Sequence, residues 1–573
     1  MHKKTLVNVL GVVYTHLKSH DGGDLYLTPY AEKHHRIFDT RNWFERRWFD
    51  KHKVKLKGTS SVYRVPTKKV DGRSFNLVVK YCRVGEDVPL DTHTLQEFCD
   101  AEFNSPWEEF SLVMEMEEGR FGSKDIKINT QHPIGIYVPP EMMQIWQSGR
   151  SRAKINRIRA KHPGIDLDIL KQYLLMYQWI EGYNLTEMFD HINVDIDERA
   201  HHLKKLDSKA VSDLNRKGYL VADTKPEHII IGEDDSREIR EMGNPEREEA
   251  AKEKLSYIYN IMSQRRYSVV DYELLLRTPE HEAEVKESKR HSYLDDQRDR
   301  FIPIPLPSHL SRMEVFNVPY IYGHAESTGG HLWVVGNNAR LFDYFLPERW
   351  RKTPSIRLSE SKEVFYTVTK DNIHLVWETS SVGEVPIEYG GESRRMVIEF
   401  GINSPFEEFA ISYTLNHLGI PCAYARAIYM TGTKKIESSD DTSRYESHKE
   451  ILDPEGSPIL REEHNYITIR GYYNGPDNWV AEQEGPLYVP VDLHNAVEKS
   501  IIDESVCQTL LNNVKYNLKN VGYDGSLLKP DDLLLSLDSN NEIIKDNSGR
   551  PLVVICNFEH IWKNTKVGRM SYE

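Results

Sequence analysis

The chain has 573 residues, of which 39% are apolar and 28% charged, and its formal net charge is −14. This length predicts two to four domains, and the negative charge argues against a general electrostatic affinity for nucleic acid or acidic membranes. Five cysteines are scattered along the chain without a CxxC pair, which argues against a disulfide framework and against a thiolate metal site.

No stretch of the sequence approaches the roughly 18 apolar residues of a membrane span. The first residues, MHKKTLVNVLGVVYTH, contain a short apolar run that is broken by Asn8 and lacks a small-residue cleavage site. They predict a first β-strand rather than a secretion signal. We therefore expect a cytoplasmic protein.

The predicted elements of the first half follow a definite order. A Gly-Thr-Ser-Ser turn precedes a β-rich segment that ends at residue 66, and residues 75–82, FNLVVKYC, predict a strand. Ser105 and Pro106 predict the N-cap and first turn of a helix. Residues 174–180 predict a second strand, 221–231 a loop that enters a strand, and 267–271 a strand that ends in an acid.

Segments of the first half recur in the second half in the same order, which predicts an internal duplication. The matching blocks are 14–25 with 322–332, 36–39 with 340–343, 58–66 with 378–386, 104–110 with 403–409 and, more weakly, 218–231 with 522–535. The segment FIPIPLP at 301–307 places a proline at every second position, which favours an extended connector. We therefore expect domains at 1–305 and 306–573.

The segment Asp223-Thr-Lys225-Pro226-Glu-His228 is similar to the Asp-Leu-Lys-Pro-Glu-Asn loop of protein kinases. Together with the order of turn, strand lysine, helix glutamate and strand-ending acid, it makes the chain resemble the protein-kinase superfamily over residues 55–275 and, in degenerate form, 375–560. The resemblance implies an α+β fold of two tandem kinase-like bilobal units, with ATP and Mg²⁺ or Mn²⁺ as cofactors.

Phosphoryl transfer needs positioning and charge neutralisation, and the resemblance assigns residues to both tasks. Lys80 on its strand would hold the α- and β-phosphates. Glu109 is the first choice for the helix carboxylate that orients this lysine, because Leu112 and Val113 then follow as the packed face; Glu108 is the competitor. Further cofactor contacts are predicted from the turn and from the strand at 174–180: Gly58, Ser60, Ser61, Val62, Met176 and Tyr177.

The remaining candidates act on the transferred group or on the metal. Asp223 would accept the proton of the attacking hydroxyl, and Lys225 would neutralise the phosphoryl group. Asp271 would bind the divalent metal. His228 stands where kinases have a metal-binding asparagine, and since imidazole suits transition metals better than magnesium, a second magnesium ion is in doubt.

Each of these residues also has a structural interpretation. Lys80 could be a solvent-facing edge residue, Asp223 a turn residue and His228 a structural hydrogen-bonding group. Glu108 and Glu109 could be first-turn acids that interact with the helix dipole, and their repetition at 407 and 408, without a lysine partner, favours that interpretation.

The second copy lacks the chemistry at the matching positions. Glu399 replaces the strand lysine, Leu527 the catalytic aspartate, Asn557 the metal aspartate and Glu378 the turn glycine, whereas Lys529 and Pro530 remain and Asp532 stands opposite His228. An acid at the phosphate position repels ATP. We expect this half to bind no nucleotide and, by analogy with pseudokinases, to regulate or scaffold.

Four charged or polar segments lie outside these motifs. Residues 147–162 carry six cations and predict a solvated helix or a docking patch for an anionic substrate or nucleic acid. Residues 234–266 and 280–300 predict solvated helices, and 437–455 a flexible loop.

The sequence thus predicts an ATP-dependent phosphotransferase that acts on a hydroxyl of a protein or small molecule, with a protein partner on the second half. A non-catalytic tandem pseudokinase and a nucleotidyl transferase are the alternatives.

Overall fold

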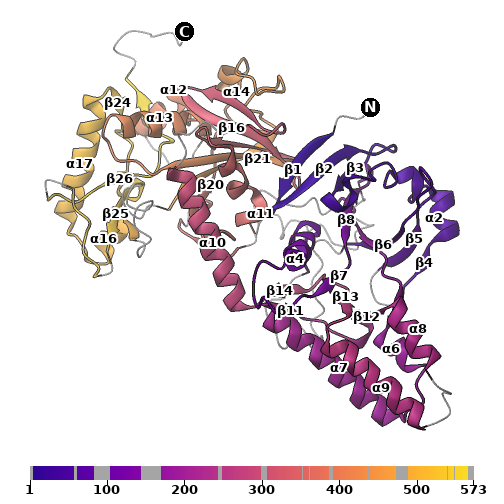
Figure 1. The fold of residues 1–573 in the computed structure, drawn as a ribbon. Helices are drawn as coiled ribbons and strands as arrows, with labels where there is room; N and C mark the ends of the chain where they lie inside the picture. Colours follow the sequence, from indigo (N-terminus) through magenta and orange to yellow (C-terminus); the bar gives the residue numbers. More distant parts are fainter. Residues whose placement is uncertain are drawn as a thin grey trace. The chain divides into compact units, whose positions relative to one another are not determined.

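The computed structural model describes residues 4–56, 61–82, 103–142, 170–242, 248–298, 306–351, 353–359, 362–385, 391–435, 438–472, 488–538, 540–546 and 549–564. Contacts within these residues divide the chain into two compact units: unit 1 ends at Val285 and unit 2 begins at Lys286, inside helix α10 (Pro279–Arg298) (Figure 1). Each unit contains one large antiparallel sheet together with helices, so the fold class is mixed α+β. No described helix is both long and apolar enough to cross a membrane.

The large sheet of unit 1 has eight strands in the order β1-β2-β3-β8-β9-β6-β5-β4. Their bounds are β1 Thr5–Val9, β2 Val12–Lys18, β3 Asp24–Leu27, β4 Val54–Lys55, β5 Val62–Pro66, β6 Asn76–Tyr81, β8 Pro133–Val138 and β9 Leu174–Gln178. The strands predicted at 75–82 and 174–180 are thereby confirmed as β6 and β9. Helices α1 (Pro29–Glu32) and α2 (Arg46–His52) lie between β3 and β4 in the chain.

Alternate residues of β6 face opposite sides of this sheet, as strand geometry requires. Leu77 and Val79 pack into a hydrophobic core with Met176 of β9, which lies opposite Val79 in the strand register. Lys80 and its neighbour two residues earlier, Val78, therefore occupy the other face.

Helix α4 (Pro106–Glu118) begins as the sequence predicts. The Ser105 hydroxyl accepts a hydrogen bond from the amide of Glu108 at 3.2 Å, and the Glu108 carboxylate accepts one from the amide of Ser105 at 3.0 Å. This capping box satisfies two amides that the first helical turn leaves free. Just before it, the side chain of Asn104 donates to the carbonyls of Tyr272 and Leu275, which fixes the helix start against a distant segment.

The remainder of unit 1 has two small sheets and a set of helices. One sheet has the order β10-β12-β13-β7, and the other pairs β11 with β14. The strands are β7 Asn129–Thr130, β10 Gly182–Asn184, β11 Tyr219–Val221, β12 Ile229–Gly232, β13 Tyr267–Val269 and β14 Leu275–Arg277; the helices are α6 Leu185–Phe189, α7 Ile196–Arg216, α8 Glu233–Glu241 and α9 Glu248–Ser263. Helices α7 and α9 lie side by side (Figure 1). Helices α8, α9 and α10 confirm the two predicted helical segments.

The large sheet of unit 2 repeats the strand order of unit 1 as β15-β16-β17-β21-β22-β20-β19-β18. Its strands are β15 Ser311–Val315, β16 Val318–Ala325, β17 Gly330–Val335, β18 Ser355–Arg357, β19 Val364–Val368, β20 His374–Thr379, β21 Ala425–Lys434 and β22 His464–Gly471. Helix α13 (Pro405–His417) starts with the same capping box, formed by Ser404 and Glu407.

The other elements of unit 2 also follow those of unit 1. Strands β23 (Val489–Asp492), β25 (Leu533–Leu537) and β26 (Val554–Ile555) form one small sheet, and β24 (Tyr523–Asp524) pairs with β27 (Trp562–Lys563). The helices are α11 Pro347–Trp350, α12 Gly391–Phe400, α14 Ser443–His448, α16 Leu493–Glu498 and α17 Glu504–Asn520. Helix α14 corrects the prediction of a flexible loop at 437–455. The basic segment 147–162 lies outside the described residues.

The strand register corrects the alignment of the two halves. Lys80 of β6 lies opposite Val62 of β5, and Glu378 of β20 lies opposite Val364 of β19. Glu378 therefore holds the position of Lys80, rather than that of the turn glycine. Glu399, which the sequence placed there, is an exposed residue of helix α12. The error arose because the block at 378–386 matches a turn that precedes β5, whereas in the structure it spans the end of β20.

Candidate functional site

The side chain of Lys80 is the centre of a buried charge cluster in unit 1. Its ammonium lies 2.8 Å from Oδ1 of Asp271, 3.4 Å from Oε1 of Glu109 and 3.4 Å from Oε2 of Glu273, and only 6% of the side chain is exposed. The interpretation of Lys80 as a solvent-facing edge residue is therefore wrong. The cluster joins strand β6, helix α4 and the segment after β13.

The structure separates the two candidate glutamates of helix α4. Glu108 closes the capping box, so its carboxylate serves the helix backbone. Glu109 is 1% exposed and contacts Lys80, and the hydroxyl of Tyr177 donates to the same carboxylate oxygen at 2.8 Å. Burial raises the pKa of Glu109 and outweighs the opposing effect of Lys80. Glu109 is thus the residue that orients the lysine.

Two facing loops carry the remaining candidates. Strand β11 pairs with β14, and β12 pairs with β13, so the loop 222–228 lies opposite the loop 270–274. The amide of Ala222 donates to the carbonyl of Leu274 at 3.1 Å, and the amide of Val270 donates to the carbonyl of His228 at 2.9 Å. This double ladder brings the Asp223 loop and the Asp271 loop together although 48 positions separate the two aspartates in the sequence.

The two carboxylate oxygens of Asp271 contact different side chains. Oδ1 contacts Lys80, and Oδ2 lies 3.7 Å from Nε2 of His228. The backbone of Asp271 has a φ of 68°, a left-handed conformation that costs a non-glycine residue about 1–3 kcal/mol and is concentrated at functional sites. The ladder on either side holds the residue in this conformation.

Lys80 and Asp271 both keep their charges at neutral pH. Burial by itself would lower the pKa of Lys80, but Asp271, Glu109 and Glu273 outweigh it and hold the pKa above its ordinary value. Burial would likewise raise the pKa of Asp271, but Lys80 and His228 keep it well below the ordinary range. An ammonium and an ionised carboxylate are therefore both present where the resemblance requires them.

Asp223 and Lys225 lie at the solvent-accessible part of the loop. Their side chains are 45% and 52% exposed and form an ion pair of 2.7 Å. Since a hydroxyl substrate must reach the proton acceptor from outside, exposure suits the role assigned to Asp223. Helix turn η3 (Pro226–His228) follows directly and carries His228 to Asp271.

The predicted cofactor contacts on the strands fall on two faces. Val62 is opposite Lys80, and the carbonyl of Ser61 accepts a hydrogen bond from the amide of Tyr81 at 3.1 Å. The side chain of Tyr177 lies on the same face of the sheet as Lys80, and its hydroxyl donates a hydrogen bond to Glu109. Met176 is fully buried in the core on the opposite face, so the prediction that it contacts the cofactor is wrong for its side chain. Gly58 and Ser60 lie outside the described residues.

The donor set of the cluster fits a nucleotide only together with a divalent cation. One ammonium faces three carboxylates, an excess of negative charge that would repel a polyphosphate. Oδ2 of Asp271 and the imidazole of His228 can hold the cation, and Nδ1 of His228 is buried without a hydrogen-bond partner within the described residues. An imidazole ligand suits a transition-metal ion better than Mg²⁺.

Sequence reasoning missed Glu273 and the part played by Tyr177. A signal for Glu273 existed, because Asp271-Tyr-Glu273 recurs as Asn557-Phe-Glu559. Glu559 is also buried, and it pairs with Lys362, just before β19. The acid two residues after Asp271 in unit 1, and after Asn557 in unit 2, is therefore part of the charge cluster of its unit.

Unit 2 balances its buried acids differently. Glu408, in the position of Glu109, pairs with Arg470 of β22. Arg470 lies opposite Val376, as Tyr177 lies opposite Val78, so the cation has moved one strand away from the position of the lysine. The repeated helix acid does have a basic partner, contrary to the sequence interpretation.

An excess of acid surrounds this cation. Burial raises the pKa of Glu378 to about 7, with a contribution from Glu559, and burial raises the pKa of Glu408 to about 8. Asn557 donates to Asp532 at 2.8 Å, and burial raises the pKa of Asp532 to about 6. The cluster has no lysine on β20, and Leu527 replaces the exposed aspartate of the loop.

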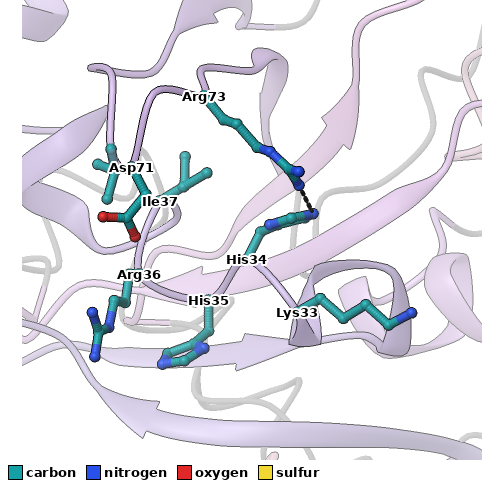
Figure 2. Close-up of a pocket in the computed structure, with 8 residues that line it drawn as sticks. Lys33, His34, His35, Arg36, Ile37, Asp71 and Arg73 are labelled. Carbon is teal, nitrogen blue, oxygen red and sulfur yellow. Dashed lines mark hydrogen bonds between the residues drawn. The ribbon is translucent and has the colours of Figure 1, made fainter.

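A separate basic hollow of about 440 Å³ lies on unit 1 (Figure 2). It is lined by Lys33, His34, His35, Arg36, Ile37, Val70, Asp71 and Arg73. Figure 2 shows Arg73 reaching His34, with 3.3 Å between the two nitrogens. Its lining shares no residue with the Lys80 cluster, and the side chains of Lys33, Arg36 and Arg73 are exposed.

Comparisons with models of protein families, with curated proteins and with solved structures gave no match.

Proposed function

We propose that unit 1 is an ATP-dependent phosphotransferase and that unit 2 is a non-catalytic unit of the same ancestry with a regulatory or scaffolding role. The observation that carries the proposal is the convergence of Lys80, Glu109 and Asp271 from three separate elements. The shared strand order and the repeated capping box support the common ancestry.

The residues of unit 1 divide the work of phosphoryl transfer. ATP with Mn²⁺ or Mg²⁺ supplies the transferable phosphoryl group and the charge that neutralises it. Lys80, oriented by Glu109, holds phosphate oxygens, and Asp271 with His228 holds the cation. Asp223 accepts the proton from the attacking hydroxyl oxygen, and Lys225 stabilises negative charge on the group in transit. The substrate is a hydroxyl of a protein or a small molecule.

One observation favours the alternative that the protein is non-catalytic. Three carboxylates already neutralise the ammonium of Lys80, as a purely structural ion cluster would. Nucleotidyl transfer would use the same residues and release pyrophosphate in place of ADP.

A thermal-shift titration of the full chain with ATP and Mn²⁺ or Mg²⁺ tests the proposal. Ligand at about 100 times its Kd stabilises the native state by about 2.7 kcal/mol, which should raise the Tm of unit 1 by roughly 5 °C. The shift should vanish in Lys80→Ala and Asp271→Asn, and persist in Lys69→Ala, a control at an exposed lysine of the same unit.

A wild-type chain whose Tm does not respond to ATP with either metal would contradict the proposal and favour the structural ion cluster. Because Lys80→Ala removes a buried charge, Asp271→Asn serves as the variant with preserved shape. Identification of the released product as ADP or pyrophosphate separates the two kinds of transfer.

A further inference from the structure

Two histidines of unit 2 form a cross-strand pair beside the turn of the β16–β17 hairpin. His324 of β16 lies directly opposite His331 of β17, and their ring centroids are 4.5 Å apart. His331 is 8% exposed, whereas the side chain of His324 is 39% exposed. The pair therefore has a buried member and a member at the surface.

A third potential ligand comes from a loop more than 120 positions away in the sequence. A carboxylate oxygen of Glu455 contacts Nε2 of His324, and one ligand atom from each of the three residues lies within 4.8 Å of the other two. The ligands of a tetrahedral zinc ion, each about 2.1 Å from the metal, lie about 3.4 Å apart. Small rotations of the exposed side chains of His324 and Glu455 would close this difference.

The loop that carries Glu455 is held in place by Asp453. The carboxylate of Asp453 accepts hydrogen bonds from the amides of Glu455 at 2.9 Å and Ser457 at 3.0 Å, and Nη2 of Arg461 donates to it at 2.5 Å. Asp453 is 4% exposed. The approach of Glu455 to the hairpin is thus built into the fold.

The hydroxyl of Tyr322 supports two of the three candidate ligands. It lies 2.5 Å from Nδ1 of His331 and donates to Oε1 of Glu455 at 2.9 Å. Groups in such a position orient the rings and carboxylates that bind a metal. A simple surface ion pair between His324 and Glu455 would require neither His331 nor this tyrosine.

The corresponding hairpin of unit 1 lacks both histidines, because the strand register places Lys18 of β2 and Asp24 of β3 where unit 2 has His324 and His331. His16 of β2 lies opposite Tyr26 of β3, and its Nε2 contacts Asp24 at 2.9 Å. Unit 1 therefore has an ion pair of 2.6 Å between Lys18 and Asp24 at the positions where unit 2 has two imidazoles. This difference supplies an internal control.

We propose that His324, His331 and Glu455 bind a zinc ion in unit 2, with a fourth position open to water or to an exogenous ligand. Two imidazoles and one carboxylate are a zinc donor set, whereas magnesium and calcium prefer oxygen ligands. The ion would fasten the 453–457 loop to the hairpin. The inference is independent of the proposed nucleotide chemistry of unit 1.

The test strips the full chain of metal with a chelator, adds Zn²⁺ and removes the unbound metal by dialysis. Metal analysis should find about one Zn²⁺ per wild-type chain that excess Mg²⁺ does not displace, and calorimetric titration should give its Kd. His324→Asn and Glu455→Gln, both at exposed side chains, should weaken binding at least ten-fold. The loss of one of the three ligands in His331→Tyr should do the same. Zinc should also raise the Tm of the wild type but not that of His324→Asn.

Two control variants locate the ion. His16→Asn should bind zinc as the wild type does, because it alters the matching hairpin of unit 1. Asp271→Asn should also retain zinc. The inference is overturned if the wild type binds no zinc, if His324→Asn and Glu455→Gln bind it with unchanged affinity, or if Asp271→Asn alone removes it.

Discussion

Units 1 and 2 have the same eight-stranded order but place their buried cation on different strands. In unit 1 the helix glutamate pairs with Lys80 of β6, and in unit 2 it pairs with Arg470 of β22, beside a buried acid at the lysine position. Removing the partner of a buried charge costs about 3–5 kcal/mol. The comparison teaches that this helix acid requires a cation, and that either of two neighbouring strands can supply it.

The surrounding frame is the same in both units. Asn104 donates to two carbonyls of the segment after Asp271, and Asn403 donates to the carbonyls of Phe558 and Ile561 in the corresponding segment. The fold therefore does not depend on which strand carries the cation. What differs is the residue at the lysine position, which is an ammonium beside Asp271 in unit 1 and the buried acid Glu378 in unit 2.

The largest expected effect is on catalysis at the exposed loop of unit 1. Asp223→Asn should lower the rate of phosphoryl transfer by about 10²–10⁴-fold, because a positioned proton acceptor contributes that much. ATP binding should be unchanged, since Asp223 is not part of the Lys80 cluster. Single-turnover rates and nucleotide titration measure the two effects. Leu527→Asn at the matching loop of unit 2 is the control and should leave the rate unchanged; equal rates in wild type and Asp223→Asn would exclude the role of the aspartate.

Exchanging the cation between strands tests the comparison directly. Arg470→Tyr leaves Glu408 buried without its partner and should destabilise unit 2 by about 3–5 kcal/mol. Adding Glu378→Lys recreates the unit 1 arrangement and should recover much of that loss. Denaturant unfolding of the two single variants and the double variant gives the coupling energy. Purely additive effects would mean that the two strand positions are not interchangeable.

The acid excess of unit 2 predicts a pH dependence centred on Glu378. Burial raises the pKa of Glu378 from 4.5 to about 7, so between these values the folded state binds more protons than the unfolded state. The free energy of unfolding should therefore fall as pH rises from about 4.5 to 7. Glu378→Gln should stabilise the chain at pH 8 but not at pH 5, as measured by the hydrogen-exchange protection of β20.

The matched control for this pH effect is Glu399→Gln, an exposed acid on helix α12 of the same unit. It should leave the protection of β20 unchanged at both pH values. In unit 1, the lowered pKa of Asp271 adds stability that is present above the ordinary aspartate range and is lost only as pH falls toward the folded value. A gain in Glu378→Gln of equal size at pH 5 and pH 8 would contradict the assigned pKa.

The smallest effect concerns the two capping boxes. Ser105→Ala and Ser404→Ala each remove a side chain that accepts a hydrogen bond from the third helical amide. Each should lower the free energy of unfolding of its unit by about 1 kcal/mol. Thermal unfolding measures the change, and Ser208→Ala, within an exposed stretch of helix α7, is the control. The Ser404 hydroxyl also hydrogen-bonds to Nε2 of His448 at 2.9 Å, so a smaller loss in Ser404→Ala than in Ser105→Ala would contradict the prediction.

Local sequence determined the elements that carry the candidate site. The apolar run around Lys80, the Ser-Pro helix start, the loop from Asp223 to His228 and the strand ending near Asp271 all appear where their residue patterns predict them. These features depend on neighbouring residues, because strand alternation and helix capping are satisfied within a few positions of the chain. The fold class and the choice of Glu109 over Glu108 also followed from such patterns.

Only the tertiary structure decided which charges meet. It showed that Glu378, and not Glu399, occupies the lysine position, that Arg470 serves Glu408, and that Glu455 approaches two histidines of a distant hairpin. Each of these contacts is set by strand register or by a loop anchored far along the sequence. A shift of one residue in register turns every side chain to the opposite face of the sheet, so local residue patterns could not identify the partners.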